Sequence, residues 1–344
     1  MSSTHFDLSS GGACPTDIQR TLPLLREVSP STALNRLIDN AYDRLPRPGQ
    51  GQTLDRWRVL AAVAAHDLSL AKLFEGHTDA LAILADAGCA LGAHGGLWAT
   101  WCAEPPDAPL QLIESSASSI ILRGLKAWCS GAHDATHAVV SCWGSNNEAF
   151  LAAVDLRQPG VTITEDGWHA VGMHATRSVD VIFDDVPATL LGGPDFYVQR
   201  AGFWHGGAGV AACWFGAATR LAEVLRERLA ERADPHRLAQ LGQVSVALRA
   251  SAALLREAAA EIDAAPSADA MALALSVRLN VEASASLVLE AVGRALGAGP
   301  LCKDAAVARL YADLPVFIRQ SHAERDQEAL GRAVLAHAEA PWTL

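Results

Sequence analysis

The hydrophobic pattern of this chain changes twice along its length, and these changes restrict the fold more than any other feature. Residues 17–88 and 203–339 carry apolar side chains at three- and four-residue spacing, which is typical of amphipathic helices. Between about 94 and 200, short apolar and β-branched runs are separated by Gly, Pro, Asp and Asn, as in antiparallel β-structure. The sequence therefore predicts an α+β protein in the order helical domain, β-domain, helical bundle.

We place the domain boundaries at these two changes of pattern. The expected parts are an N-terminal helical domain over 1–93, a middle antiparallel β-domain over 94–200 and a C-terminal helical bundle over 201–344. Residues 1–15 are polar and rich in Gly and Ser, so we expect them to be mobile. Half of the 344 residues are hydrophobic, which favours a large core and association into a homodimer or homotetramer.

The composition argues against several classes of partner. The net charge is −11 and the basic residues form no stripe, which disfavours nucleic acid. No apolar run reaches the roughly 18 residues of a membrane span, and the first residues lack the basic and apolar regions of a secretory signal. The seven cysteines are odd in number and form no C-x-x-C pair, so we expect reduced thiols in a cytoplasmic protein.

The segment from Leu122 to Val140 contains the most informative motif of the chain. A predicted strand reaches Gly124, turns, and continues through Lys126, Trp128 and Ser130 in the order G-x-K-x-W-x-S. Residues two apart on a strand point to the same face, so Trp128 and Ser130 would present an aromatic ring and a hydroxyl to one ligand. The alternative is an ordinary half-buried strand.

Five further segments occur in an order that matches a known pattern. They are Ala65–Ala71, Thr100–Pro105, Trp168–Ser178, Phe183–Pro187 and Asp313–Gly331. With the G-x-K-x-W-x-S strand, they resemble motifs of the acyl-CoA dehydrogenase superfamily, and the resemblance extends from about residue 55 to the end. It implies the same order of helical domain, β-domain and helical bundle.

The resemblance also implies a flavin site. In that family the Trp of the motif packs against the flavin ring and the hydroxyl two residues later hydrogen-bonds it, which corresponds here to Trp128 and Ser130. Thr100, Cys102 and Ala103 would face the ring from the neighbouring strand. The implied cofactor is FAD, with FMN as the alternative, and the implied substrate is a small molecule such as an acyl-CoA thioester.

The chain departs from the family pattern at several places. Ala103 stands where the family has a threonine whose hydroxyl bonds the flavin. The family's G-A-G-S-D turn, which meets acyl-CoA, is replaced by residues 106–110. The R-x-x-F-G segment that reaches a neighbouring subunit's FAD becomes residues 232–235, and the Q-x-x-G-G segment is reduced to residues 296–299. These losses weaken the prediction of a standard acyl-CoA site.

The catalytic base of the family is missing from its usual place. Dehydrogenation needs a carboxylate that removes the α-proton of the thioester. In many members this is a Glu eight residues after an R-D pair, and the same offset from Asp313 gives Ser321, between Gln320 and His322. Glu324 is the nearest substitute, so we take His322 and Glu324 as the catalytic candidates. The alternative for His322 is a helix-terminal residue that interacts with nearby charges.

With a histidine in this region, the chain also resembles a second branch of the superfamily. This branch consists of flavin monooxygenases similar to dibenzothiophene and p-hydroxyphenylacetate monooxygenases. In that branch another protein reduces the flavin, and the substrate is then oxygenated. A histidine near the ring can donate or accept a proton. A flavin reductase or an electron-transfer protein would therefore be a partner of this chain.

Two other patterns have simpler explanations. Gly207–Ala212 imitates a G-x-G-x-x-A nucleotide motif, but no predicted strand leads into it, so we interpret it as close packing at a helix start. His133 with His137, and His169 with His174, have spacings that could hold a metal on a helix. They fall in predicted strands or loops, so we predict no metal site.

Three functions follow from these observations. The first is a flavin-dependent oxidoreductase of acyl-CoA dehydrogenase type, which oxidises a CH–CH bond of an acyl thioester. The second is a flavin-dependent monooxygenase of the same fold. The third is a degenerate member that binds a ligand or a partner without catalysis. The altered turn and the absent Glu favour the second and third, whereas the motif around Trp128 favours the first two.

Overall fold

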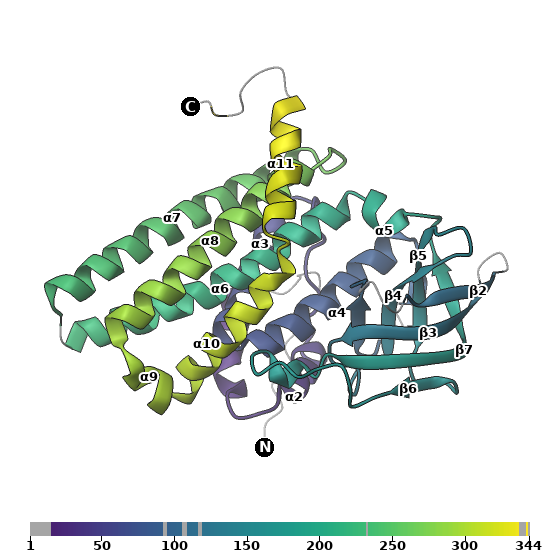
Figure 1. The fold of residues 1–344 in the computed structure, drawn as a ribbon, viewed down its shortest axis with the longest axis horizontal. Helices are drawn as coiled ribbons and strands as arrows, with labels where there is room; N and C mark the ends of the chain where they lie inside the picture. The colour runs from purple at the N-terminus through teal and green to yellow at the C-terminus, as the bar shows by residue number, and fades with distance from the viewer. Residues whose placement is uncertain are drawn as a thin grey trace.

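The computed structural model describes residues 15–91, 95–104, 109–115, 119–231, 233–336 and Trp342. Its strands lie together at one end of the molecule and its long helices at the other (Figure 1). The expected mobility of residues 1–15 falls almost wholly outside the described residues, as does most of the altered turn over 106–110.

The N-terminal part is helical, as the spacing of its apolar residues predicts. Its helices are α1 (Pro15–Thr21), η1 (Leu22–Leu25), α2 (Pro30–Asp39), α3 (Thr53–His66) and α4 (Leu68–Asp86). The side chain of Asp67 accepts a hydrogen bond from Leu70 N at 2.8 Å and so caps α4. Helix α4 then runs along the sheet, where it packs against the first strand (Figure 1).

The middle part forms one seven-stranded sheet that closes on itself. The strands are β1 (Trp98–Trp101), β2 (Gln111–Ser115), β3 (Ser119–Cys129), β4 (His137–Trp143), β5 (Ala149–Asp155), β6 (Val161–Ile163) and β7 (Val179–Leu191). Their order is β1-β4-β2-β3-β7-β5, β5 also pairs with β4, and β6 pairs with β7. The pairings β4-β2-β3-β7-β5-β4 therefore make a barrel.

The prediction of an antiparallel sheet is correct for most pairs and wrong for two. Strands β1 and β2 both run parallel to β4. A short hairpin cannot produce a parallel pair. Here β1 enters the sheet from helix α4, and β2 joins β4 through a single pair of residues, Gln111 and Trp143, which completes the barrel.

The C-terminal part is a bundle of long helices. They are α5 (Phe196–Gln199), α6 (Gly202–Glu231), α7 (Pro235–Ala264), α8 (Met271–Leu296), α9 (Ala298–Lys303), α10 (Ala305–Phe317), η4 (Ile318–Gln320) and α11 (Glu324–Ala336). Helices α6, α7 and α8 pack side by side (Figure 1). Gly209 lies on α6, and a Cβ there would be 3.3 Å from Trp57 Nε1, in agreement with the packing interpretation of the glycine motif.

Three bundle helices are more apolar than the sequence analysis suggested. By length and composition alone, α6, α7 and α8 could each cross a membrane, with mean hydropathy of 1.2 to 1.4 over their most apolar stretches. In the structure they pack against one another, and 72% of the apolar stretch of α6 is buried. The absence of a membrane span therefore remains a prediction.

Candidate functional site

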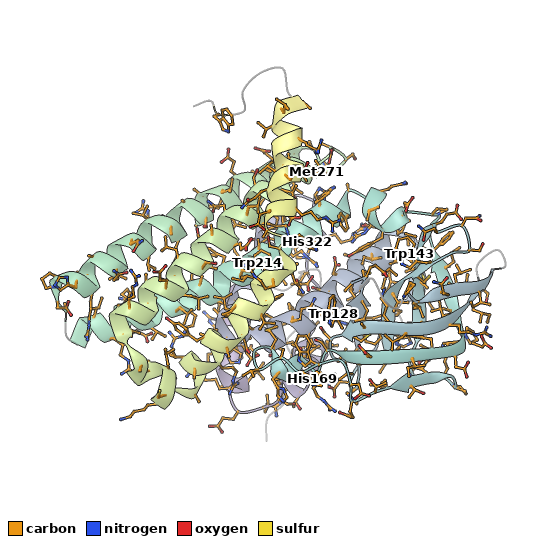
Figure 2. The ribbon with its side chains drawn as sticks, viewed as in Figure 1. Trp128, Trp143, His169, Trp214, Met271 and His322 are labelled. Carbon is orange, nitrogen blue, oxygen red and sulfur yellow. The ribbon has the colours of Figure 1, made fainter. Side chains whose placement is uncertain are left out.

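Trp128 lies at the end of β3, where the barrel meets the helices (Figure 2). Its backbone has φ of 58°, a left-handed conformation that bulky residues rarely adopt. The pairing of β3 with β7 shifts register between Lys126 and Cys129, and the carboxylate of Asp180 accepts a hydrogen bond from Trp128 N–H. Half of the Trp128 surface is exposed (50%), whereas Lys126 and Cys129 are buried.

This geometry differs from the strand alternation that the sequence predicts for Trp128 and Ser130. β3 ends at Cys129, so the regular alternation of faces stops before it reaches Ser130. The Ser130 hydroxyl lies 2.7 Å from that of Ser178, which lies 2.8 Å from the hydroxyl of Thr176. Thr176 in turn donates to Met173 O at 2.8 Å. A chain of hydroxyls therefore joins the end of β3 to the loop that precedes β7.

Thr100 and Ser130 come together, although they are 30 positions apart in the sequence. Both line a hollow of about 10 Å³, along with Lys72 and Gly76 of α4. The Thr100 hydroxyl donates to Gly76 O at 2.8 Å, so it joins β1 to α4. A hollow of this size holds about one water molecule. A flavin ring would have to lie outside it, towards the exposed face of Trp128.

Cys102 and Ala103 follow β1 and are half-buried. The Cys102 thiol is hydrogen-bonded with the side chain of Tyr197 of α5. Burial raises the pKa of the Cys102 thiol to about 11, and the nearby Lys126 ammonium opposes this shift only in part. The thiol is therefore protonated at neutral pH and unsuited to act as a nucleophile.

Lys126, the lysine of the G-x-K-x-W-x-S strand, lies inside the barrel with 1% of its side chain exposed. Its ammonium donates to Glu104 Oε1 at 2.7 Å, to Ser141 Oγ at 2.8 Å and to Ser141 O at 3.0 Å. Trp143 Nε1 donates to the other oxygen of Glu104 at 3.0 Å. This ion pair joins the segment after β1 to β3, two residues before Trp128. A lysine at the start of a strand is usually exposed, so the sequence pattern alone did not indicate this ion pair.

The two catalytic candidates lie at the beginning of α11. The His322 side chain is 62% exposed, and its Nδ1 is 3.4 Å from Asp326 Oδ1. Asp326 also accepts a hydrogen bond from His322 N at 3.0 Å and so caps the helix. Glu324 is exposed in the first turn of α11, whereas Ser321 is buried. Among the described residues, no cavity or contact links His322 or Glu324 to Trp128 or Ser130.

One face of α4 carries charged groups that the sequence analysis did not single out. Lys72 pairs with Glu75 at 3.0 Å, and Asp79 is 3.9 Å from Arg200. Arg56 of α3 donates to Thr78 at 3.2 Å. Burial lowers the pKa of Arg56 and raises that of Asp79, although Arg200 opposes the latter shift. Charges at three- and four-residue spacing usually indicate a solvent-facing helix surface, so the pattern alone did not reveal this buried group.

The end of β3 fits a flat aromatic ligand. Trp128 offers an exposed ring that borders the buried interior, and stacking on an indole is a favourable interaction. Ser130 is half-buried nearby and offers a hydroxyl held by Ser178. A flavin has a planar ring with polar edges, so these residues suit it.

Comparisons with known proteins agree with this architecture. Residues 109–186 match the family model for the acyl-CoA dehydrogenase middle domain. No curated protein matches the sequence. Over 95% of its length the chain has the acyl-CoA dehydrogenase-like fold, which confirms the expected fold class and the resemblance on which it was based.

Three solved structures illustrate the likeness. KijD3 in complex with FMN and dTDP-3-amino-2,3,6-trideoxy-4-keto-3-methyl-D-glucose is 18% identical, with a TM-score of 0.80 over 95% of this chain and 94% of that one. FMN-bound TdsC from Paenibacillus sp. A11-2 is 18% identical, with a TM-score of 0.78 over 94% and 96%. The methanesulfinate monooxygenase MsuC from Pseudomonas fluorescens is 20% identical, with a TM-score of 0.75 over 95% and 96%.

Proposed function

We propose that this protein is a flavin-dependent monooxygenase that uses FMN and receives it in reduced form from a separate reductase. The main alternative is the dehydrogenase of acyl thioesters with FAD, which the motifs around Trp128 would serve equally well. Proteins of the same fold include FMN-bound TdsC, a dibenzothiophene monooxygenase, and the methanesulfinate monooxygenase MsuC. These proteins are 18–20% identical to this chain. The likeness therefore shows a shared fold, and it supports the activity as a proposal.

The choice of a monooxygenase rests on Ser321, which stands where many acyl-CoA dehydrogenases have their catalytic Glu. Ser321 is buried in the turn between η4 and α11 and cannot remove a proton from carbon. Asp326, the buried carboxylate close by, accepts the backbone N–H of His322 and is committed to the helix cap. Glu324 is exposed to solvent. A reaction that needs no carboxylate at this point fits the site better than thioester desaturation.

The residues at the end of β3 would hold the cofactor. When bound, the flavin supplies two-electron redox chemistry and reaction with oxygen. Trp128 would stack on the ring and exclude water from one of its faces. The Ser130 hydroxyl could hydrogen-bond the ring edge, and its contact with Ser178 holds it in place. The ion pair of Lys126 and Glu104 keeps the two chain segments that carry these groups in register.

His322 remains a candidate for handling a proton on the substrate. It stands in the turn after η4, and its ring nitrogen faces Asp326 at 3.4 Å. A histidine can donate or accept a proton near neutral pH. The assignment of His322 and Glu324 stays a prediction, to be decided by experiment.

The test compares two reactions in three proteins. Wild type, His322→Ala and Glu324→Gln are each assayed with acyl-CoA thioesters plus a dye acceptor, and separately with reduced FMN plus oxygen. We expect no dye reduction in any of them, and altered oxygen consumption by reduced FMN in wild type. Dye reduction by wild type that is lost only in Glu324→Gln would instead establish the dehydrogenase.

A further inference from the structure

Three hydroxyl groups form a continuous chain between the end of β3 and the loop before β7. The Ser130 hydroxyl lies 2.7 Å from that of Ser178, and the Ser178 hydroxyl lies 2.8 Å from that of Thr176. The chain ends at the carbonyl oxygen of Met173, 2.8 Å from the Thr176 hydroxyl. Ser178 and Thr176 are 3% and 1% exposed, whereas Ser130 is half-buried. Of the three residues, Ser130 is therefore the one that a bound molecule can reach.

The carbonyl at the end of the chain fixes the direction of every hydrogen bond in it. A carbonyl oxygen carries no proton, so Thr176 donates its single hydroxyl proton to Met173 O. Thr176 then accepts from Ser178, and Ser178 in turn accepts from Ser130. The Ser130 proton is therefore directed into the protein, and the Ser130 oxygen offers only lone pairs to a ligand.

Met173 is held in place, which keeps this direction from reversing. Its N–H donates to the buried carboxylate of Asp313 on α10 at 2.5 Å. The residue before it packs directly on the same helix, where a Cβ at Gly172 would lie 1.8 Å from Ala312 O. A reversed chain would leave the oxygens of Thr176 and Met173 2.8 Å apart with no proton between them, which is unfavourable in a buried site.

The two redox states of a flavin differ at their ring nitrogens. Reduction adds a proton to a ring nitrogen, which changes from an acceptor of hydrogen bonds into an N–H donor. An oxygen that offers only lone pairs can bind this N–H, but it repels the unprotonated nitrogen of the oxidised ring. Ser130 has to give up its hydrogen bond to Ser178 before it can donate to the oxidised ring, so the oxidised form binds with one hydrogen bond fewer.

We infer that the hydroxyl chain from Ser130 to Met173 makes the protein select reduced FMN over oxidised FMN. Ser178 and Thr176 are positioning residues in this process, because they are buried and act by setting the direction of the Ser130 hydroxyl. The inference rests on the binding of FMN at the end of β3 that is proposed above. A protein with this selectivity retains the reduced form that a reductase delivers and releases the oxidised form for another cycle.

The test measures the dissociation constants of oxidised FMN and, under anaerobic conditions, of reduced FMN. We expect wild type to bind the reduced form more tightly. Ser178→Ala frees the Ser130 proton, so the ratio of the oxidised to the reduced constant should fall about tenfold, since one hydrogen bond distinguishes the two forms. The midpoint potential of the bound flavin should fall with it by about 30 mV, which corresponds to a tenfold change for a two-electron couple.

Three further variants show whether the effect comes from the direction of the hydroxyl. Thr176→Val breaks the next link of the chain and should lower the ratio likewise, whereas Thr176→Ser keeps the hydroxyl and should retain the wild-type ratio. Ser251→Ala is the matched control, because Ser251 is a fully buried serine of the bundle whose hydroxyl lies 2.8 Å from that of Ser284. It should leave the ratio unchanged. A loss of packing alone would weaken both forms of FMN equally and would not change the ratio.

An unchanged ratio in both Ser178→Ala and Thr176→Val, or an equal fall in Ser251→Ala, would overturn the inference. Binding of oxidised FMN by wild type with equal or higher affinity than reduced FMN would refute the selection of the reduced form and leave the FMN site intact. Absence of binding in both redox states would refute the proposed monooxygenase and this inference together.

Discussion

Replacing Trp128 with alanine should weaken the binding of FMN about 100-fold. A tryptophan side chain buries at most about 250 Å². Half of Trp128 is exposed, so a ring stacked on it could cover roughly 100 Å². At about 25 cal/mol per Å², this area corresponds to roughly 2.5 kcal/mol, and each 1.4 kcal/mol is about tenfold in the dissociation constant.

The backbone of Trp128 allows an effect on binding to be separated from an effect on folding. Its φ of 58° is strained for any residue with a Cβ, by about 1–2 kcal/mol. Trp128→Gly should therefore be more stable than Trp128→Ala by about 1 kcal/mol, which reverses the usual order of these two residues. Both variants should lose FMN affinity to the same extent.

The assay is fluorescence titration of FMN, combined with urea denaturation of each variant. Trp342→Ala is the matched control, because Trp342 is 80% exposed and lies outside the site. Equal FMN affinity in wild type, Trp128→Ala and Trp342→Ala would refute the assignment of Trp128 to the flavin. An alanine variant at position 128 as stable as the glycine variant would refute the argument from strain.

Three further predictions concern stability and assembly. Burial raises the pKa of Asp313 to about 6, so its contribution to stability is present below about pH 4 and is lost as the pH rises to about 6, by up to about 3 kcal/mol. Asp313→Asn should lack this loss when urea denaturation at pH 4 and pH 7 is compared, and an unchanged pH dependence would contradict it. Lys126→Met should cost about 2 kcal/mol in urea denaturation, because it removes the hydrogen bonds of the ammonium to Glu104 and to the buried Ser141 hydroxyl. Adding Glu104→Gln should recover the part that comes from the unpaired carboxylate, and a double variant no more stable than Lys126→Met would argue against the ion pair. Only 17% of the apolar stretch of α7 is buried, and Val246 on this helix is 72% exposed, so sedimentation velocity should show a dimer or tetramer that Val246→Glu weakens. A wild-type monomer at micromolar concentration would contradict this.

Much of the fold follows from the periodicity of the chain. The apolar spacing of helices such as α3 and α6 is a local property, and so is the alternation in strands such as β4. The parallel pairing of β1 and β2 with β4 is not local. It depends on where helix α4 leads into β1 and on the one ladder pair of β2 with β4, Gln111 with Trp143.

The site could be predicted only in part. The order of motifs placed Thr100 near Ser130, and in the structure both line the same hollow. The left-handed backbone of Trp128 could not be predicted, because tryptophan has no preference for positive φ and the register shift beside β7 arises from pairing. The buried charges of Asp79 and Arg200 were also missed, since only tertiary contacts distinguish them from a solvent-facing pattern.

The most direct test of the proposed function is the reaction of oxygen with reduced FMN in the presence of the protein. Reduced FMN is mixed anaerobically with excess protein and then with oxygenated buffer, and its reoxidation is followed by stopped-flow absorbance. A bound flavin shielded by Trp128 should react at a rate clearly different from that of free reduced FMN, and Trp128→Ala should restore the free rate. Reoxidation at the free rate with wild-type protein would contradict the account.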